Sequence, residues 1–192
     1  KEGADFLSQI TGKEVPWLVD PTFLIDAKEW EKLCVRPPIN EKYIFIYALT
    51  GENYLVDIAK KIRNKTGYKI LYQRHNIRSF VNVDKVMYDS GPAEFLGFIR
   101  NAEIVLTDSF HGTVFSTIFD KPFYTFITRP KVSTRIYNLA NILDIYDRIV
   151  TPSTLNDIEF STIPYKTNKD RLNQMIEQSK SFIQKNIIDE NI

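Results

Sequence analysis

Short apolar runs alternate with stretches of helical periodicity between residues 43 and 143, and this alternation restricts the possible folds most strongly. Residues 43–48 are apolar throughout, which is typical of a strand buried on both faces of a parallel sheet. Residues 54–64 follow with apolar side chains at the spacing of one helix face. Strands that alternate with helices favour a doubly wound parallel sheet with right-handed crossovers. We therefore predict an α/β, Rossmann-like fold.

The same patterns predict the remaining elements. Further strands are expected at residues 68–72, 85–88, 104–106 and 122–126. Gly91-Pro92 is expected to open a helix, because proline is tolerated in the first helical turn. Helices are also predicted at residues 3–10, 27–33, 112–119 and 134–143, and an amphipathic helix at residues 168–187.

A proline-containing stretch divides the chain into two predicted parts. Pro37 and Pro38 lack amide donors, so residues 35–40 are expected to form an irregular linker. The chain begins at Lys1 rather than Met and enters a helical pattern at once, which indicates the interior of a longer protein. Residues 1–40 are therefore predicted to be the trailing segment of a missing N-terminal domain plus the linker. Trp17 and Trp30 are interpreted as hinge packing, with a role as platforms for sugars as the alternative. Residues 41–192 are predicted to form a Rossmann-like domain that ends in the amphipathic helix.

Composition excludes several classes of protein. The formal net charge of +1 gives no basis for nucleic-acid binding. A single cysteine and two histidines favour neither a disulfide framework nor a zinc site, and they suit a reducing compartment. We find no signal-peptide pattern and no apolar run approaching the roughly 20 residues of a membrane helix. We expect a cytoplasmic protein, with peripheral attachment to the inner membrane as an alternative.

Open parallel sheets bind ligands at the carboxyl ends of their strands, so the loops at residues 49–53, 73–77 and 107–112 are the candidate sites. In the third loop, Asp108 and Ser109 end a strand and His111 leads into a helix N-terminus. Unpaired amides there favour an anion such as phosphate or carboxylate, with an imidazole beside it. The alternative is structural: Asp108 or Ser109 caps the helix and His111 is an ordinary first-turn residue. Arg74 and Arg135 lie near other strand ends, where solvated surface cations are the alternative.

The sequence resembles the polysaccharide pyruvyl transferase family at several ordered motifs. The main one is Asp108-Ser109-Phe110-His111-Gly112. The others are the aspartate-proline-threonine segment Val19-Asp20-Pro21-Thr22-Phe23-Leu24, Gly91-Pro92-Ala93-Glu94-Phe95-Leu96-Gly97, Ile99-Arg100-Asn101-Ala102, Phe115-Ser116, Lys121-Pro122, and Ser133-Thr134-Arg135-Ile136 with Leu143, Asp147 and Arg148. Ser179 and Phe182 in the final helix also fit the family pattern, so the resemblance covers most of the chain from Val15 onward.

The resemblance implies one half of a two-domain enzyme similar to the glycosyltransferase B architecture. Such an enzyme transfers the pyruvyl group of phosphoenolpyruvate to a sugar or a lipid-linked oligosaccharide in bacterial exopolysaccharide synthesis, without a cofactor, and this chain would hold the donor. His111 and Asp108 are the predicted catalytic residues. The predicted substrate-binding residues are Ser109, Gly112, Thr113, Arg135, Arg74, Thr50 and Gly51. Many family members have arginine where this chain has Ser109, and Arg135 is the candidate to supply the missing guanidinium.

The predicted mechanism needs an acid for the methylene group of phosphoenolpyruvate and cations or amides for its anionic groups. His111 is the candidate acid and base, with Asp108 as its orienting partner. A helix N-terminus disfavours imidazolium, but a bound trianionic donor favours it, so we expect His111 to gain a proton when the donor binds. A nucleotide-sugar glycosyltransferase domain and a non-catalytic scaffold of polysaccharide assembly remain alternative functions.

Overall fold

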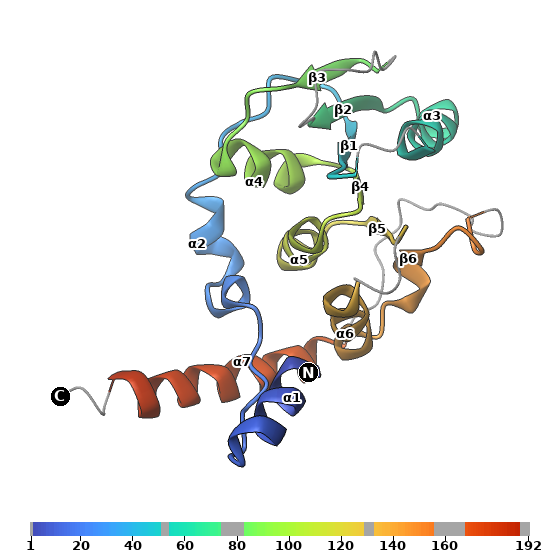
Figure 1. Ribbon diagram of the computed structural model, residues 1–192. Coiled ribbons are helices and arrows are strands. Elements are labelled where there is room, and N and C mark those ends of the chain that lie inside the picture. The colour runs from blue at the N-terminus through green and yellow to red at the C-terminus, as the bar shows by residue number, and fades with distance from the viewer. Residues whose placement is uncertain (1, 51–53, 74–82, 129–132, 156–167, 189–192) are drawn as a thin grey trace.

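The computed structural model describes residues 2–50, 54–73, 83–128, 133–155 and 168–188. Over these residues six parallel strands form one sheet in the order β3-β2-β1-β4-β5-β6 (Figure 1). The strands are β1 (Tyr43–Tyr47), β2 (Lys69–Gln73), β3 (Lys85–Met87), β4 (Ile104–Thr107), β5 (Phe123–Phe126) and β6 (Ile149–Val150). The strand order reverses between β1 and β4, as in a doubly wound Rossmann-like sheet, so the predicted fold class is confirmed.

The helices lie where the sequence periodicity predicts them. They are α1 (Glu2–Thr11), α2 (Ala27–Glu31), α3 (Tyr54–Thr66), α4 (Pro92–Asn101), α5 (Phe110–Ile118), α6 (Thr134–Leu143) and α7 (Lys169–Ile183), which continues as the π-helical turn η4 (Gln184–Ile188). The short 3₁₀ helices η1 (Pro21–Leu24) and η3 (Tyr146–Arg148) and the two-residue strand β6 were not predicted. Elements this short carry too few residues to show a period.

Successive strand residues point to opposite faces of the sheet, and each face has its own core. One face of β1 presents Tyr43 and Phe45 to the cluster that contains the apolar residues of α4, α5 and α6. The other face presents Ile44 and Ile46 to α3. In Figure 1, α3 accordingly lies on one side of the sheet and α4 and α5 on the other. Each β1 side chain from residue 43 to 46 is at most 2% exposed, which explains the continuous apolar run.

The segment before β1 packs against the α/β unit. Phe23 is buried in the core cluster of α4, α5 and α6, and the Trp30 ring meets the Phe115 ring edge-on with centroids 5.1 Å apart. Trp30 therefore has the predicted packing role. The Val19 amide donates to Ser179 Oγ of α7 at 3.1 Å, and the Val35 amide donates to the Ala93 carbonyl of α4 at 3.0 Å. The division at residue 40 stays a prediction, but the structure adds that residues on both sides of it share one core.

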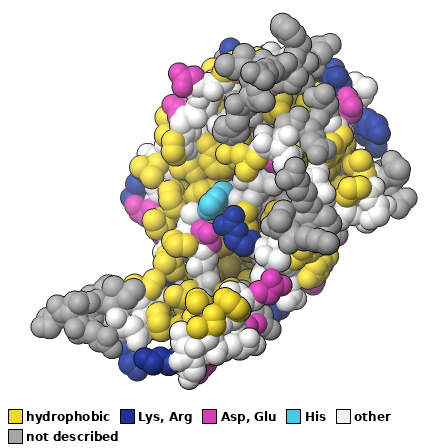
Figure 2. Space-filling view, viewed as in Figure 1, with side chains coloured by type: hydrophobic (Ala, Val, Ile, Leu, Met, Phe, Trp, Pro, Cys, Tyr) yellow, Lys and Arg dark blue, Asp and Glu magenta, His cyan; other side chains and the backbone are white. Residues whose placement is uncertain are grey.

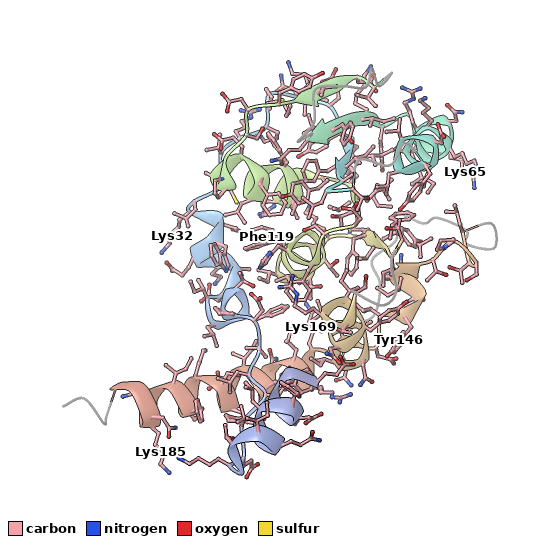
Figure 3. The ribbon with its side chains drawn as sticks, in the orientation of Figure 1. Lys32, Lys65, Phe119, Tyr146, Lys169 and Lys185 are labelled. Atoms are coloured by element: carbon pink, nitrogen blue, oxygen red, sulfur yellow. The ribbon has the colours of Figure 1, made fainter. Side chains whose placement is uncertain are left out.

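The C-terminal helix α7 is fixed to the end of α5. Lys169, at the start of α7, donates to Asp120 Oδ2 at 2.7 Å, and Asp120 directly follows the buried Phe119. Figure 3 shows the Phe119 side chain between α5 and α2, whereas the side chains of Lys32 and Lys185 point outward. Among the described residues, no helix has both the length and the apolar character that a membrane crossing requires.

Candidate functional site

The site lies where the strand order reverses, at the carboxyl ends of β1 and β4. Open α/β sheets have a crevice at this position, because the connections leave β1 and β4 toward opposite faces. The loop after β1 begins with Ala48, and β4 leads through Asp108 and Ser109 directly into α5. Residues 49–50 of the first predicted loop thus lie beside the predicted loop at residues 107–112, whereas residues 74–77 of the other predicted loop lie outside the described residues.

Ser109 starts helix α5. Its backbone is extended (φ −94°, ψ 136°), and its Oγ accepts the Gly112 amide at 3.3 Å, which is the N-cap arrangement. The Ser109 amide in turn donates to Thr107 Oγ1 at 3.0 Å. The capping alternative considered for Ser109 is therefore confirmed. Since the side chain is only 4% exposed, it fixes the helix start rather than presenting a free hydroxyl to the crevice.

Gly112 and Thr113 lie beneath the site. A Cβ on Gly112 would overlap the Thr107 side chain, so glycine at this position allows α5 to approach β4 closely. Thr113 Oγ1 donates to the Ser109 carbonyl at 3.0 Å and lies 2.7 Å from Thr125 Oγ1. Thr113 is fully buried. The Thr113 hydroxyl therefore anchors the helix, and the absence of a side chain at Gly112 serves packing, while the substrate contacts predicted for these two residues stay predictions.

Asp108 joins the two central loops. One carboxylate oxygen accepts the Leu49 amide at 2.7 Å, and the other accepts the Thr50 amide at 2.9 Å together with the Thr50 hydroxyl. Burial and, secondarily, the Asp108 charge raise the pKa of the nearby Tyr47 phenol, which is therefore neutral at physiological pH. Asp108 and Thr50, predicted as a catalytic and a binding residue, bond to each other and shape the crevice. The contacts of the Asp108 carboxylate are with the loop after β1 and not with His111, so the orienting role predicted for Asp108 stays a prediction.

The carboxylate that approaches His111 is that of Asp20, whose Oδ2 lies 3.7 Å from His111 Nε2. Asp20 caps η1, because its Oδ1 accepts the Thr22 amide at 3.1 Å and the Thr22 hydroxyl at 2.7 Å. These bonds hold the carboxylate and leave Oδ2 facing the imidazole. The His111 side chain is 50% exposed and that of Asp20 is 19% exposed, so a ligand can reach the histidine while the carboxylate stays partly shielded.

A cavity of about 210 Å³ adjoins this pair, between the segment before η1 and helices α5, α6 and α7. Arg135 lines it, and the Arg135 guanidinium lies over the Phe110 ring, 4.6 Å from the centroid. This contact is a cation–π arrangement that holds the cation near the start of α5. Figure 2 shows histidine, basic and acidic side chains gathered on one face of the molecule amid apolar surface.

The structure thus brings together some of the predicted site residues. The start of α5 contains Ser109, His111 and Gly112. Beside it, Asp108 bonds to Thr50 and so joins the β4 and β1 loops, a contact that we call the clamp. Arg135 lies near the same turn because its guanidinium packs on the Phe110 ring. Arg74 and Gly51, both predicted to bind substrate, lie outside the described residues. Sequence reasoning missed Asp20, although its aspartate-proline-threonine segment was among the motifs that carried the family resemblance.

Chemically, the start of α5 presents an exposed imidazole and backbone donors, with the Asp20 carboxylate beside the imidazole. The Gly112 and Thr113 amides bond to Ser109, while the Phe110 and His111 amides precede the point where intrahelical bonds begin. The helix dipole adds positive potential there, which favours an anion. Among the described residues, no group of three or more histidine, cysteine, aspartate or glutamate side chains has the geometry of a metal site.

Solved structures with a similar fold are distant in sequence. UDP-GlcNAc 2-epimerase from Methanocaldococcus jannaschii is 16% identical with a TM-score of 0.42, over 79% of this chain and 41% of that one. A glycotransferase of kitacinnamycin is 14% identical with a TM-score of 0.42, over 77% and 37%. The glycosyltransferase SnogD from Streptomyces nogalater is 9% identical with a TM-score of 0.39, over 88% and 44%. The chain thus matches about two fifths of each, and its fold assignment rests on the strand order instead.

No curated protein matches the sequence. The family model described as polysaccharide pyruvyl transferase matches residues 2–129, which is most of the chain. The matched region contains the aspartate-proline-threonine segment, the clamp between the β1 and β4 loops, and the histidine at the start of α5. The chain therefore belongs to the polysaccharide pyruvyl transferase family.

Proposed function

We propose that this chain binds phosphoenolpyruvate at the start of α5 and takes part in transferring its pyruvyl group to two hydroxyls of a sugar. The observation that carries the proposal is the half-exposed His111 in the first turn of α5, with Asp20 Oδ2 at 3.7 Å from its Nε2. The family membership makes the protein a transferase of polysaccharide modification. The donor and the ketal product are the parts we propose.

The donor carries a phosphate and a carboxylate, and each needs a cation or amide partner. The Phe110 and His111 amides at the N-terminus of α5 suit one of these anions. Arg135 is the candidate for the other, because its guanidinium is held above the Phe110 ring beside the same turn. Ser109 stands where many family members have arginine, but its side chain caps helix α5 and does not replace the guanidinium.

His111 supplies the proton in the proposed first step. One sugar oxygen attacks C2 of phosphoenolpyruvate while imidazolium donates a proton to C3, so the methylene becomes a methyl group. The proton released by that hydroxyl restores the imidazolium. The C2–O bond to phosphate then breaks, and phosphate leaves with the electron pair. The second hydroxyl attacks C2 and gives its proton to phosphate, so the products are a cyclic ketal and hydrogen phosphate.

Asp20 has a positioning role in this scheme. A carboxylate beside the imidazole stabilises its charged form and restricts its orientation, as the partners of catalytic histidines do. Asp20 is suited to this because Thr22 holds its other oxygen. The reaction requires no cofactor. By analogy with two-sided clefts, a further domain of the whole protein would provide the opposite side of the site and part of the acceptor contacts.

Calorimetric titration of the full-length protein with phosphoenolpyruvate, uridine diphosphate and inorganic phosphate tests the proposal. Phosphoenolpyruvate should bind more tightly than phosphate, and His111→Ala should weaken it by about tenfold, the equivalent of one charge-assisted hydrogen bond. Tighter binding of uridine diphosphate would instead favour a nucleotide-sugar glycosyltransferase. Failure of every donor to bind would favour a non-catalytic scaffold.

A further inference from the structure

The cavity beside the Asp20–His111 pair is a second feature of this region, which we call the Trp17 cavity. It measures about 210 Å³, and its lining includes Trp17, Asp20, Phe110, Arg135, Asn138 and Leu172. The apolar lining residues Phe23, Leu139, Ile142 and Leu172 are buried, whereas Trp17, Asp20, Phe110 and Asn138 are half-buried and Arg135 is exposed. The cavity is therefore apolar inside and polar toward its opening.

Its lining combines two kinds of group that a sugar ring requires. The half-buried indole of Trp17 offers an apolar surface on which the C–H face of a sugar can pack. Asp20, Arg135 and Asn138 offer planar hydrogen-bonding groups, which can accept from and donate to hydroxyls. Arg135 and Asn138 lie three residues apart on α6, so both project from one face of that helix. A gap left by imperfect packing would not be expected to gather these polar groups.

The position of the cavity relates it to the proposed chemistry. Asp20 borders the cavity, and its Oδ2 also faces His111 Nε2 at 3.7 Å. Phe110 lines the cavity and directly precedes His111, with ring centroids 5.4 Å apart. A molecule in the cavity that reaches Asp20 therefore places its polar groups beside the imidazole. The volume lies below the roughly 300–1,000 Å³ of sites for drug-sized ligands, which suits one ring rather than an extended oligosaccharide.

We propose that the Trp17 cavity holds the sugar ring of the acceptor that receives the pyruvyl group. The ring packs on Trp17, Asn138 binds a hydroxyl near the opening, and the reacting hydroxyls point past Asp20 toward His111. This inference rests on the proposed function for the identity of the reaction, but the cavity and its lining are independent of the donor. It also gives Trp17 a binding role, where hinge packing was predicted.

Titration with methyl hexosides tests the inference, with the Trp17 indole N–H followed by NMR in the full-length protein. The probes are methyl glycosides of glucose, galactose, mannose and N-acetylglucosamine, each with and without phosphoenolpyruvate. At least one should shift the Trp17 signal in a saturable way and leave that of Trp30 unchanged. Trp30 is the matched control, because it packs against Phe115 and does not line the cavity.

Two variants on one helix sharpen the test. Asn138→Ala should weaken the hexoside by about fivefold, as expected for one lost hydrogen bond of about 1 kcal/mol. Asn141→Ala is the control, since Asn141 is exposed on α6 outside the cavity lining. Equal effects of both substitutions, or shifts at Trp17 and Trp30 alike, would overturn the inference.

The donor titration separates the two proposals. If phosphoenolpyruvate shifts the His111 signals and no hexoside shifts Trp17 in its presence, the acceptor assignment is wrong and the donor site stands. If a hexoside binds at Trp17 and phosphoenolpyruvate binds nowhere, the sugar site stands and the pyruvyl-transfer proposal fails.

Discussion

Asp20 and His111, which belong to segments far apart in the sequence, place Oδ2 and Nε2 within 3.7 Å of each other. The approach depends on the segment before β1 being packed on the α/β unit through Phe23 and through the hydrogen bond from the Val19 amide to Ser179. The carboxylate beside the histidine at the helix start therefore comes from the other side of the predicted linker.

Asp20→Asn should separate binding from turnover. The substitution keeps the cap of η1 but removes a negative charge next to the donor anion, so phosphoenolpyruvate should bind equally well or slightly better. Transfer should slow by about tenfold or more, because the imidazolium loses its charged partner. Asp26→Asn is the control, since Asp26 caps α2 in the same way through the Glu29 amide. Parallel loss of affinity and rate in both variants would contradict the role of Asp20.

Arg135→Lys should weaken phosphoenolpyruvate binding by about tenfold. Lysine keeps the charge but cannot make a bidentate contact or stack flat on Phe110. The matched control is Arg100→Lys, since Arg100 pairs with Glu31 through Nε at 2.8 Å away from the site. Calorimetry with both variants checks the prediction. Unchanged affinity in the Arg135 variant would remove this residue from the donor site.

Gly112→Ala should destabilise the fold by about 1–3 kcal/mol, the usual cost of overpacking. The added methyl group would overlap the Thr107 side chain, which is fully buried and bonded to the Tyr47 carbonyl and the Ser109 amide. Urea denaturation measures the change. A stability equal to that of the wild type would show that α5 does not need its close approach to β4.

Gly97→Ala tests how firmly the segment before β1 is held. A Cβ on Gly97 would overlap the Val35 carbonyl, which is backbone and cannot rotate away. We expect a loss of at least about 1–3 kcal/mol in the free energy of unfolding and a change in Trp30 fluorescence. Gly3→Ala, where no atom lies within 4 Å of the added Cβ, should be neutral or slightly stabilising. Equal stability of both variants would contradict the packing of residue 35 on α4.

Asp84 should make the stability depend on pH. Burial alone would raise the pKa of Asp84, but hydrogen bonds from the Ile70 amide and from Lys69 and Arg63 outweigh it and lower the pKa. The pKa of Asp84 is therefore lower in the folded state than in the unfolded state, where it is about 3.9. Its contribution to the free energy of unfolding is fully present above the unfolded-state pKa and is lost as the pH falls through the folded-state pKa.

Asp84→Asn measures that contribution. Because the carboxylate is partly exposed and screened, we expect the variant to lose only about 1 kcal/mol or less at neutral pH. The difference from the wild type should shrink as the pH falls below 4 and the aspartate becomes protonated. Urea denaturation at a series of pH values measures both. A difference that grows toward acid pH would contradict the assigned direction.

Most of the fold could be predicted from the sequence, because its elements are long enough to show a period. The strand β1 is buried on both faces, and α3, α4, α6 and α7 carry apolar residues at helical spacing. Two things could not be read in this way. The elements η1 and β6 are too short, and the packing of residues 17–35 depends on contacts such as Trp30 with Phe115 that join distant segments.

The candidate site was predictable only in part. The turn after β4 could be located, because a strand that leads directly into a helix creates an anion site in parallel sheets. The carboxylate beside His111 could not, since Asp108 is the nearer acid in sequence and Asp20 the nearer one in space. Asp108 instead accepts from the Leu49 and Thr50 amides of the loop after β1.

The central claim is that phosphoenolpyruvate binds at the first turn of α5, against His111. The most direct measurement is an NMR titration of the protein with phosphoenolpyruvate that follows the His111 imidazole and the Phe110 and His111 amides. We predict saturable shifts of these signals that inorganic phosphate does not reproduce, together with protonation of the His111 ring. Binding that leaves the His111 imidazole unshifted, or shifts that phosphate reproduces in full, would contradict the account.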